Sequence, residues 1–351
     1  MKKIAILLLS YFVTYLQAQQ ITVALHHNGT ATMFYGNNAF SNANNTAVNG
    51  DTIYLPGNSY YSGVTVTAQL VIIGAGIHPD STTATGYTNI TSDISFQAGS
   101  DGSVLEGIYT GNNIYIGSNT RVNNVTVRRC YFSSLYFQSS FDTTHTCKNE
   151  IIEQNVINGG LLCNNSDYLI IRNNFIQGQI SGISQNALIE NNIFYYQPIS
   201  HYGAYTIYNI SGSVIRNNIF ILPATGPYQS NNYYITGGSN NNVMNNIFPV
   251  TSVEYSGDIY TNNYEGIGTD TIFVNDTVQY SSYAFNQNYH LIHPLAYPGY
   301  FNEGVGVYGG TVPMKDGLLP TNPHIIQQTI APNTDTNGKL NINIKVDAQN
   351  N

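Results

Sequence analysis

Residues 141–150, FDTTHTCKNE, hold the densest group of side chains capable of chemistry in this 351-residue chain. Asp142 and His145 are close enough in sequence for a carboxylate to orient an imidazole as a general base. Lys148 could bind a substrate carboxylate, and Glu150 adds a second acid to the same short segment. The group predicts a weak candidate catalytic site, for which an ordinary solvated loop is the alternative.

A second set of candidates is aromatic and amide rather than charged. Counting back from the fourth position of the six-residue repeat described below places four further strands at 134–138, 161–164, 206–209 and 233–236. The positions expected to point outward are Tyr136, Gln138, Asn164, Tyr208 and Tyr234. Tyrosine rings pack on sugar rings while their hydroxyls hydrogen-bond. This face therefore predicts binding of a polysaccharide or a protein partner, and a face that only contacts solvent is the alternative.

Metal and two-carboxylate chemistry have little support in the sequence. Calcium needs six to eight oxygen ligands, several of them carboxylates, and glycosidases need two positioned carboxylates. Glu254 and Asp258 are near each other in sequence, but nothing places them across a groove. Cys130, Cys147 and Cys163 lack zinc-site spacing and allow at most one disulfide. We expect no metal and no cofactor.

The composition favours an uncharged, polar surface. Charged residues make up 9% of the chain, against about 25% in ordinary soluble domains, and there are 29 Tyr and no Trp. The formal net charge of -8 becomes -10 if Lys2 and Lys3 are removed. An acidic chain with few cations has no electrostatic reason to bind nucleic acid.

The first 18 residues have the pattern of a secretory signal. Lys2 and Lys3 precede an apolar run from Ile4 to Val13 that is too short to span a bilayer, and Ala18 offers a small residue for cleavage. We expect a mature chain that begins at Gln19 and is secreted to the periplasm, the cell surface or the medium. No later segment predicts a membrane span.

The strands and turns that would position these side chains are predicted from a six-residue sequence repeat. Clear copies are IEQNVI, IRNNFI, IENNIF, IRNNIF and VMNNIF, at 152–157, 171–176, 189–194, 215–220 and 243–248. Weaker copies begin at 105, 127 and 260. Successive copies are 17 to 28 residues apart, and a fixed motif with a variable spacer is typical of a solenoid.

The six positions of the repeat, here columns one to six, predict distinct structural roles. Column three should form a bend, because Asn and Gly tolerate left-handed backbone. Column four should point inward and form an amide ladder of Asn155, Asn174, Asn192, Asn218, Asn246 and Asn263. Column six should be an inward apolar stack. Column two alternates Glu and Arg, which predicts ion pairs between neighbouring strands rather than catalytic residues.

These motifs resemble the secreted bacterial proteins of the pectate-lyase-like superfamily. The Asn-Asn bend before Phe or Ile matches that family's turn between its second and third strands. Residues 50–76 resemble its opening coils, residues 37–48 lie where it has a capping helix, and residues 288–299 and 305–310 resemble its closing segment. The resemblance implies an all-β, right-handed parallel β-helix of roughly nine to eleven rungs. The acidic clusters and the GHG and RIK motifs of its enzymes do not occur here.

We therefore expect four regions and weigh two functions. Residues 1–18 are a signal peptide, 19–49 an N-terminal strand and capping segment, 50–315 the β-helix, and 316–351 a linker with one strand that pairs with the last rung or a partner. The first function is a non-catalytic module that binds along its Tyr/Asn face. The alternative is a polysaccharide lyase or glycoside hydrolase with its site near 141–150.

Overall fold

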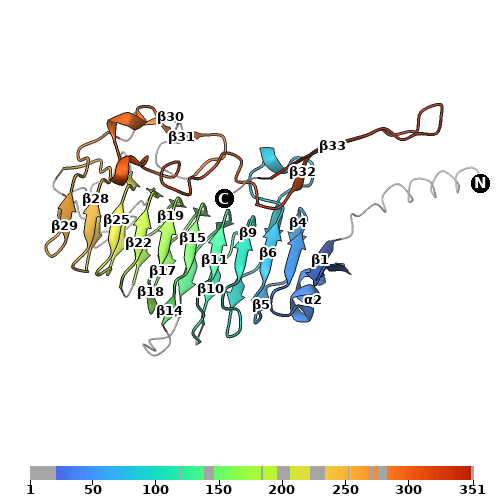
Figure 1. Cartoon of the computed structure of the whole chain (residues 1–351), viewed down its shortest axis with the longest axis horizontal. Coiled ribbons are helices and arrows are strands. Elements are labelled where there is room, and N and C mark those ends of the chain that lie inside the picture. The colour runs from blue at the N-terminus through green and yellow to red at the C-terminus, as the bar shows by residue number, and fades with distance from the viewer. Residues whose placement is uncertain are drawn as a thin grey trace, which may run out of the picture.

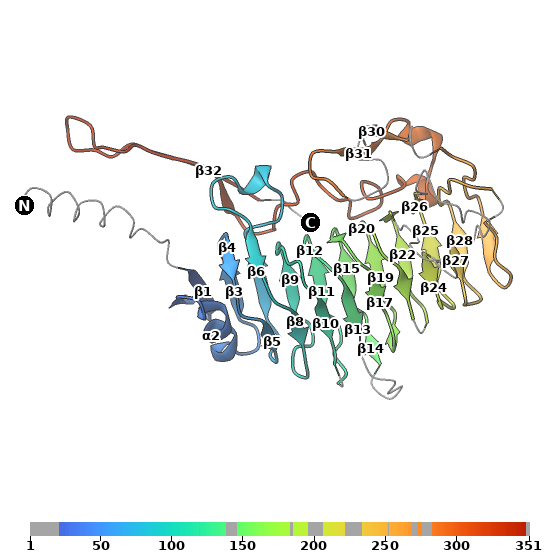
Figure 2. The same ribbon diagram turned by 180° about the vertical axis from the view of Figure 1, so that it is seen from behind.

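A computed structural model describes residues 21–118, 120–137, 146–182, 185–195, 206–221, 234–251, 253–268, 272–275 and 283–348. These residues form stacked coils of short strands, with few helical turns (Figures 1 and 2). Long parallel sheets run the length of the stack, an arrangement compatible with a β-helix solenoid. Among the described residues no helix is long and apolar enough to cross a membrane.

The strand just before each bend lies in a twelve-stranded sheet, here sheet A. In spatial order its strands are β2 (Thr30–Tyr35), β1 (Thr22–His27), β3 (Thr52–Leu55), β6 (Val71–Gly74), β9 (Val104–Glu106), β11 (Thr126–Arg128), β15 (Ile151–Glu153), β19 (Ile170–Arg172), β22 (Leu188–Glu190), β25 (Val214–Arg216), β28 (Asn242–Met244) and β29 (Ile259–Thr261). From β3 to β29 the neighbours are parallel and in register, so equivalent residues of successive coils stack in columns.

Two further sheets complete the coils. Sheet B follows the bend and contains β12 (Tyr131–Phe132), β16 (Val156–Ile157), β20 (Phe175–Ile176), β23 (Ile193–Phe194) and β26 (Ile219–Phe220). Sheet C comes next and contains β5 (Val64–Val66), β8 (Ile94–Phe96), β10 (Ile114–Ile116), β13 (Leu135–Phe137), β17 (Leu161–Leu162), β21 (Ile180–Ser181), β24 (Ile207–Tyr208) and β27 (Ile235–Thr236). The four segments predicted to be strands at 134–138, 161–164, 206–209 and 233–236 thus contribute β13, β17, β24 and β27.

Smaller elements lie beside these sheets. The two-stranded pairs are β4 (Asn58–Tyr60) with β7 (Thr88–Ile90), β14 (Cys147–Lys148) with β18 (Ser166–Asp167), β30 (Phe273–Asn275) with β31 (Asn288–Leu291), and β32 (His324–Ile330) with β33 (Ile342–Asp347). The helical segments are α2 (Ala39–Thr46), η1 (Asp80–Thr82), η3 (Pro294–Ala296) and η4 (Tyr300–Asn302). Helix α2 packs Phe40 edge-on against Tyr60 and lies at the β1 end of the stack (Figure 1).

The chain turns from sheet A toward sheet B through left-handed residues. Every column-three residue has a positive φ, between 52° and 70°: Gly107, Arg129, Gln154, Asn173, Asn191, Asn217, Asn245 and Asn262. Asn is enriched here because its short amide tolerates this conformation better than other side chains do. The bend expected at column three is confirmed.

Inside the bend, the column-four asparagines are joined by hydrogen bonds. The backbone N–H and side-chain amide of Asn174 both donate to Oδ1 of Asn192, at 3.0 Å each, and Nδ2 of Asn174 also donates to the Ile152 carbonyl at 2.8 Å. The same pattern links Asn155, Asn174, Asn192, Asn218, Asn246 and Asn263. The ladder satisfies amides that would otherwise destabilise an apolar interior.

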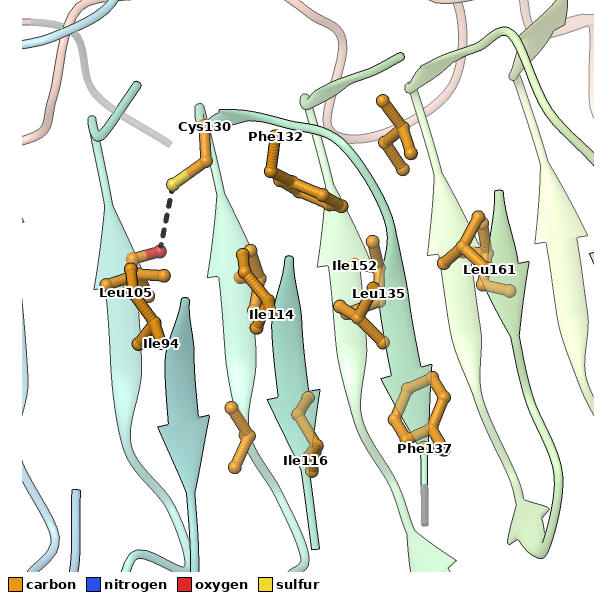
Figure 3. Close-up of a cluster of buried hydrophobic side chains, with 14 of the residues drawn as sticks. Ile94, Leu105, Ile114, Ile116, Cys130, Phe132, Leu135, Phe137, Ile152 and Leu161 are labelled. Carbon is orange, nitrogen blue, oxygen red and sulfur yellow. Dashed lines mark hydrogen bonds between the residues drawn. The ribbon is translucent and has the colours of Figure 1, made fainter. Parts of the chain in front are cut away.

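Apolar side chains fill the rest of the interior. Figure 3 shows Ile114 and Ile116 of β10, and Leu135 and Phe137 of β13, turned toward the core, where all are fully buried. In column six the Phe194 and Phe248 rings stack on either side of the Phe220 ring, with centroids 4.8 and 4.6 Å away. Parallel register thus turns each sequence column into a continuous packed stack.

Column two forms ion pairs on the outer side of sheet A. Arg128 donates to Glu106 at 2.8 Å, Arg172 to Glu153 at 2.7 Å and Arg216 to Glu190 at 2.6 Å. In each case both Nε and Nη2 bind the same carboxylate oxygen. The alternating signs therefore pair opposite charges between neighbouring coils, which is a structural use of these residues.

Residues 297–321, here called the strap, run back along the outside of the bends toward earlier coils (Figures 1 and 2). Side-chain amides of column three donate to its carbonyl oxygens: Asn245 to Pro298, Asn191 to Gly304 and Gly306, Asn173 to Val307 and Gly309, and Gln154 to Val312 and Pro313. At the far end Arg129 donates to the Leu319 carbonyl at 2.9 Å. The bend residues thus also anchor the closing segment.

The strap and the residues before it cover the outer face of sheet B. Val156, Phe175, Ile193 and Ile219 point away from the interior and form a second buried cluster. Its other side includes Phe273, Tyr289, Val305, Val307, Met314 and Leu318. Among the three long sheets, sheet B is therefore buried on both faces by the described residues.

The expectation that the C-terminal strand pairs with the last rung is wrong, while its alternative, pairing with a partner, stays a prediction. KLNINIKV, at 339–346, contributes β33, which pairs antiparallel with β32 instead of with the last coil. Two contacts hold the base of this hairpin against the loop around η1: Thr83 Oγ1 donates to the Ile326 carbonyl and Gln328 Nε2 to the Ala84 carbonyl. Alternation along 339–346 predicted a strand, but it carries no information on which strand lies beside it.

Candidate functional site

The outward residues of sheet C form a varied column, in contrast to the repeated columns at the bend. Since Ile114 and Ile116 point inward, the residue between them points outward, and the register extends this position along the sheet. From the first coil to the last, the column reads Thr65, Ser95, Tyr115, Tyr136, Leu162, Ser181, Tyr208 and Thr236.

Tyr115 and Tyr136 form the aromatic centre of this column. Their rings are stacked with centroids 5.2 Å apart and planes inclined by 15°. The neighbours of the pair in the column, Ser95 on one side and Leu162 on the other, are too small to extend the ring stack. The outer faces of the two rings are therefore turned toward shorter side chains.

Beside the Tyr115 ring lies a shallow hollow of about 380 Å³. It is lined by Gly63, Val64, Thr65, Asp93, Ser95, Gln97, Tyr115 and Ser118. Gln97 donates from Nε2 to the Ser95 hydroxyl at 2.7 Å, and the Asn113 N–H donates to Asp93 Oδ1 at 2.9 Å. These bonds hold the polar groups in place beside a ring, the combination of flat apolar surface and fixed polar groups that sugar binding uses.

The charges of this hollow fit binding better than hydrolysis. Asp93 is the one carboxylate among its lining residues, and no Lys, Arg or His lines it. Acid-base cleavage of a glycosidic bond needs two carboxyl groups on opposite sides of the bond. The arrangement can stack and hydrogen-bond an uncharged ligand.

The structure places three of the predicted binding residues, Tyr136, Tyr208 and Tyr234, and it does not bring them together. Tyr136 lies half-buried on the outward column, and Tyr208 lies on the same column with 36% of its surface exposed. Leu162 and Ser181 lie between these two tyrosines, so they are three coils, or roughly 14 Å, apart and cannot share one sugar ring. Gln138 lies outside the described residues.

The expectation that Tyr234 points outward is wrong. Its side chain is 8% exposed and packs against the Phe220 and Phe248 rings, with centroids 5.5 Å away in both cases. Tyr234 precedes β27, and the register matches Thr236, two residues later, to Tyr208. Alternation holds only within a strand, whereas at the corner before the strand Tyr234 turns into the core, as Thr206 does in the preceding coil.

The predicted catalytic loop is only partly described. Asp142 and His145 lie outside the described residues. Lys148 is 44% exposed on β14, and its Nζ lies 3.8 Å from Asp167, which accounts for its charge. Glu150 is fully buried inside the solenoid and cannot contact an external substrate. Lys148 and Glu150 therefore do not face a common exposed site.

The three cysteines are not candidates for chemistry at the protein surface either. Cys130, Cys147 and Cys163 are buried and unpaired. Burial raises the thiol pKa to about 12 for Cys130 and to about 11 for Cys147, and it raises that of Cys163 well above its ordinary value. Because the thiolate is the reactive form, these side chains act as small apolar core residues.

Tyr115 is the functional candidate that reasoning from sequence missed. Its segment, NNIYIGS at 112–118, has the same alternation as the segments containing Tyr136 and Tyr208. The repeat copy before it, LEGIYT, lacks the Asn-Asn pair, so the position could not be aligned with the later coils. The signal was alternation alone, which identifies an outward residue but not its stacking partner.

No metal site is found in the described part of the chain, where no three His, Cys, Asp or Glu residues are grouped to hold an ion. On sheet C, the aromatic and polar candidate is the Tyr115–Tyr136 pair with its hollow. Comparisons with protein-family models, with curated proteins and with solved structures find no match to this chain.

Proposed function

We propose that this chain is a secreted or cell-surface module that binds a neutral polysaccharide along the outward column of sheet C. The observation that carries the proposal is the stacked Tyr115–Tyr136 pair beside the hollow containing Asp93, Ser95 and Gln97. An extended chain of sugar rings could stack on the outer ring faces, and its hydroxyls could bond to the polar groups beside them.

The geometry favours an extended ligand over a small enclosed one. The hollow is shallow, the column continues over eight parallel strands, and Tyr208 adds a second ring farther along. A row of uncharged groups on a rigid sheet loses little conformational entropy when it binds a polymer. The low charge of the whole chain fits a ligand without charge.

The proposal includes the finer description of the fold. We infer a right-handed parallel β-helix of roughly nine to eleven rungs, related to the pectate-lyase-like superfamily. Three sheets per coil, an Asn ladder at one bend and a helix at the β1 end support this description. The apolar run at 4–13, after Lys2 and Lys3, supports export of the chain.

The test uses the mature chain, residues 19–351, and insoluble or gel-embedded neutral polysaccharides. We expect retention on at least one polymer, and we expect Tyr115→Ala and Tyr136→Ala each to weaken it about tenfold, as loss of a central aromatic contact does. The control is Tyr35→Ala, which removes a tyrosine that is 56% exposed on β2, away from sheet C.

Three results would contradict the proposal. The first is no retention on any polymer of the panel. The second is equal retention of the Tyr115 and Tyr136 variants and the unchanged chain, which would exclude this face as the binding surface. The third is release of new chain ends, which would show a lyase or hydrolase and direct attention to the 141–150 loop.

A further inference from the structure

The last coils and the start of the strap border a second open hollow, of about 600 Å³. It lies at the end of the solenoid near β28 and β29, far from the N-terminal coils that hold Tyr115 (Figure 1). Its lining residues are Asn245, Asn262, Asn263, Tyr264, Pro298, Gly299, Tyr300, Phe301 and Asn302. The volume falls within the range of small-molecule sites, about 300–1,000 Å³.

One wall of this hollow is the open end of the amide ladder. Asn263 accepts hydrogen bonds from Asn246 and donates to the Val243 carbonyl, like the ladder residues before it. Each earlier asparagine also donates its backbone N–H and a side-chain N–H to the next rung. No further rung follows Asn263 within the described residues, and none of the hydrogen bonds described there uses these two donors.

Asn262 is a second unused amide. The column-three residues Asn173, Asn191 and Asn245 use their side-chain amides to hold strap carbonyls. Asn262 occupies the same position one coil after Asn245, with φ 52°, and its exposed side chain makes no hydrogen bond to a strap carbonyl within the described ranges. Its amide can therefore donate to and accept from a bound molecule.

Aromatic rings of the strap form the opposite wall. The Tyr300 and Phe301 rings lie 4.1 Å apart between centroids, and Phe301 is 77% exposed. Phe301 has φ 59° and ψ 24°, a conformation that is unfavourable for a bulky residue and is typical of sites where function requires strain. The apolar Phe301 ring is thus exposed to solvent at the edge of a polar hollow.

The strap segment at the hollow is held firmly in position. The Tyr300 N–H donates to Asn217 Oδ1 at 2.8 Å, and the Tyr264 hydroxyl donates to the Pro298 carbonyl at 2.8 Å. The Arg216 guanidinium lies over the Tyr300 ring, 4.9 Å from its centroid, while it also pairs with Glu190. The site is therefore formed before a ligand arrives, which reduces the entropy lost on binding.

We propose that this hollow binds a short, neutral saccharide. Its nine lining residues include four asparagines, three aromatic residues and no charged side chain, so they offer hydrogen bonds and ring faces without selecting for charge. A sugar presents an apolar CH face to the rings and hydroxyl oxygens to the unused donors of Asn262 and Asn263. The site is separate from the sheet C column and does not depend on the function proposed for that face.

The test is calorimetric titration of the mature chain with neutral trisaccharides built from glucose, galactose, mannose or xylose. We expect at least one to bind, with the same affinity at low and high salt because no ion pair forms. Phe301→Ala and Asn262→Gly should each weaken binding about tenfold. Gly keeps the left-handed bend at 262 while it removes the amide.

Two controls keep this test separate from that of sheet C. Asn240→Gly makes the same change at another exposed residue, with φ 60°, and should leave trisaccharide binding unchanged. Tyr136→Ala should weaken polymer retention but not trisaccharide binding. The proposal is overturned if no trisaccharide binds the unchanged chain, or if Phe301→Ala and Asn262→Gly both bind as tightly as that chain does.

Discussion

The turns at the two ends of the sheet A strands both use left-handed residues, but they satisfy the hydrogen bonds of their buried polar groups differently. At the bend edge, column three is left-handed and column four carries the continuous asparagine ladder. At the opposite corner, where the chain enters sheet A, Asn124, Asn149, Tyr168, Asn186 and Asn240 are also left-handed. Both corners therefore obtain a sharp turn from the same conformation.

The buried column of the opposite corner is mixed. It reads Ser103, Val125, Glu150, Leu169, Ala187, Ser213 and Asn241 from early to late coils, and it ends at the partly exposed Asp258. A short ladder forms only at its end, where Ser213 donates to Asn241 and Asn241 to Asp258, both at 3.0 Å. Glu150 lies between Val125 and Leu169, and both its carboxylate oxygens are buried without a hydrogen-bond partner within the described structure.

The difference shows that a stack satisfies a buried polar group only when the neighbouring coils carry polar groups too. A single amide or carboxylate in an apolar column has no partner above or below it. The repeated asparagines therefore stabilise the bend edge, whereas the varied residues of the opposite corner leave buried polar groups without hydrogen bonds. The same reasoning applies to the end of the ladder, because no rung after Asn263 is present among the described residues.

The largest expected effect is at Glu106, which joins the bend edge to the strap. Its buried carboxylate pairs with Arg128 and accepts from the N–H and hydroxyl of Thr321, and Arg129 lies 3.4 Å away. Glu106→Ala would leave a buried guanidinium without its carboxylate and should lower the free energy of unfolding by about 3–5 kcal/mol. Urea denaturation measures this change.

Glu190→Ala is the matched control for Glu106→Ala. It breaks the same kind of column-two pair, but its partner Arg216 is 20% exposed and can be solvated. The loss should be about 1 kcal/mol. Equal losses for the two variants would show that the bonds from Thr321 to Glu106 add nothing to the stability of column two.

The next effect is at the middle of the ladder. Asn192 accepts from the N–H and amide of Asn174 and donates to the Ile171 carbonyl and to Asn218. Asn192→Ala leaves buried donors and acceptors unpaired and should lower the free energy of unfolding by about 3 kcal/mol.

Asn263→Ala provides the comparison for Asn192→Ala, because the end residue is partly exposed and lacks the bonds to a following rung. Chemical denaturation should show a loss of about 1–2 kcal/mol. If the end variant were as unstable as the middle one, the continuity of the ladder would not be what stabilises the bend edge.

At the opposite corner, Glu150 should make stability depend on pH. Burial raises its pKa from 4.5 to about 8, so the folded state keeps the proton while the unfolded state loses it. The contribution of Glu150 to stability is therefore full below about pH 4.5 and is lost as the pH rises to about 8, by at most about 1.4 kcal/mol per pH unit. Denaturation at a series of pH values measures this slope.

Glu150→Gln should remove this part of the pH dependence, since the amide does not titrate. The slope between pH 5 and pH 8 should fall in the variant, while other titrating groups keep their contribution. An unchanged slope would mean that Glu150 has a partner that holds its charge.

The smallest expected effect on stability is on the sheet C column. Tyr208 is outward, 36% exposed and flanked by Ser181 and Thr236, so Tyr208→Ala should lower the free energy of unfolding by about 1 kcal/mol. Thermal denaturation provides the measurement. A large loss would show that sheet C, like the bend edge, stabilises the solenoid, and that it does so through its outward column.

Much of the coil could be predicted because stacking makes each sequence column a physical one. The Asn-Asn pairs at 173–174 and 191–192 specified a left-handed bend followed by an inward amide, and alternating Glu and Arg specified pairs between neighbouring coils. Such predictions need only the local backbone and the residue one coil away. Tyr234 failed the same reasoning because it lies at a corner, outside any strand.

The sequence by itself therefore determined the repeated features: the bends, the apolar interior and the charge order of column two. Only the tertiary structure decided that the bend amides hold the strap, that β33 pairs with β32, and that Tyr115 stacks on Tyr136. It alone brought Asn262 to Tyr300 and Phe301 around one hollow. The physical reason is distance along the chain, since a repeat specifies contacts with the next coil, whereas contacts between remote segments depend on where the whole chain returns.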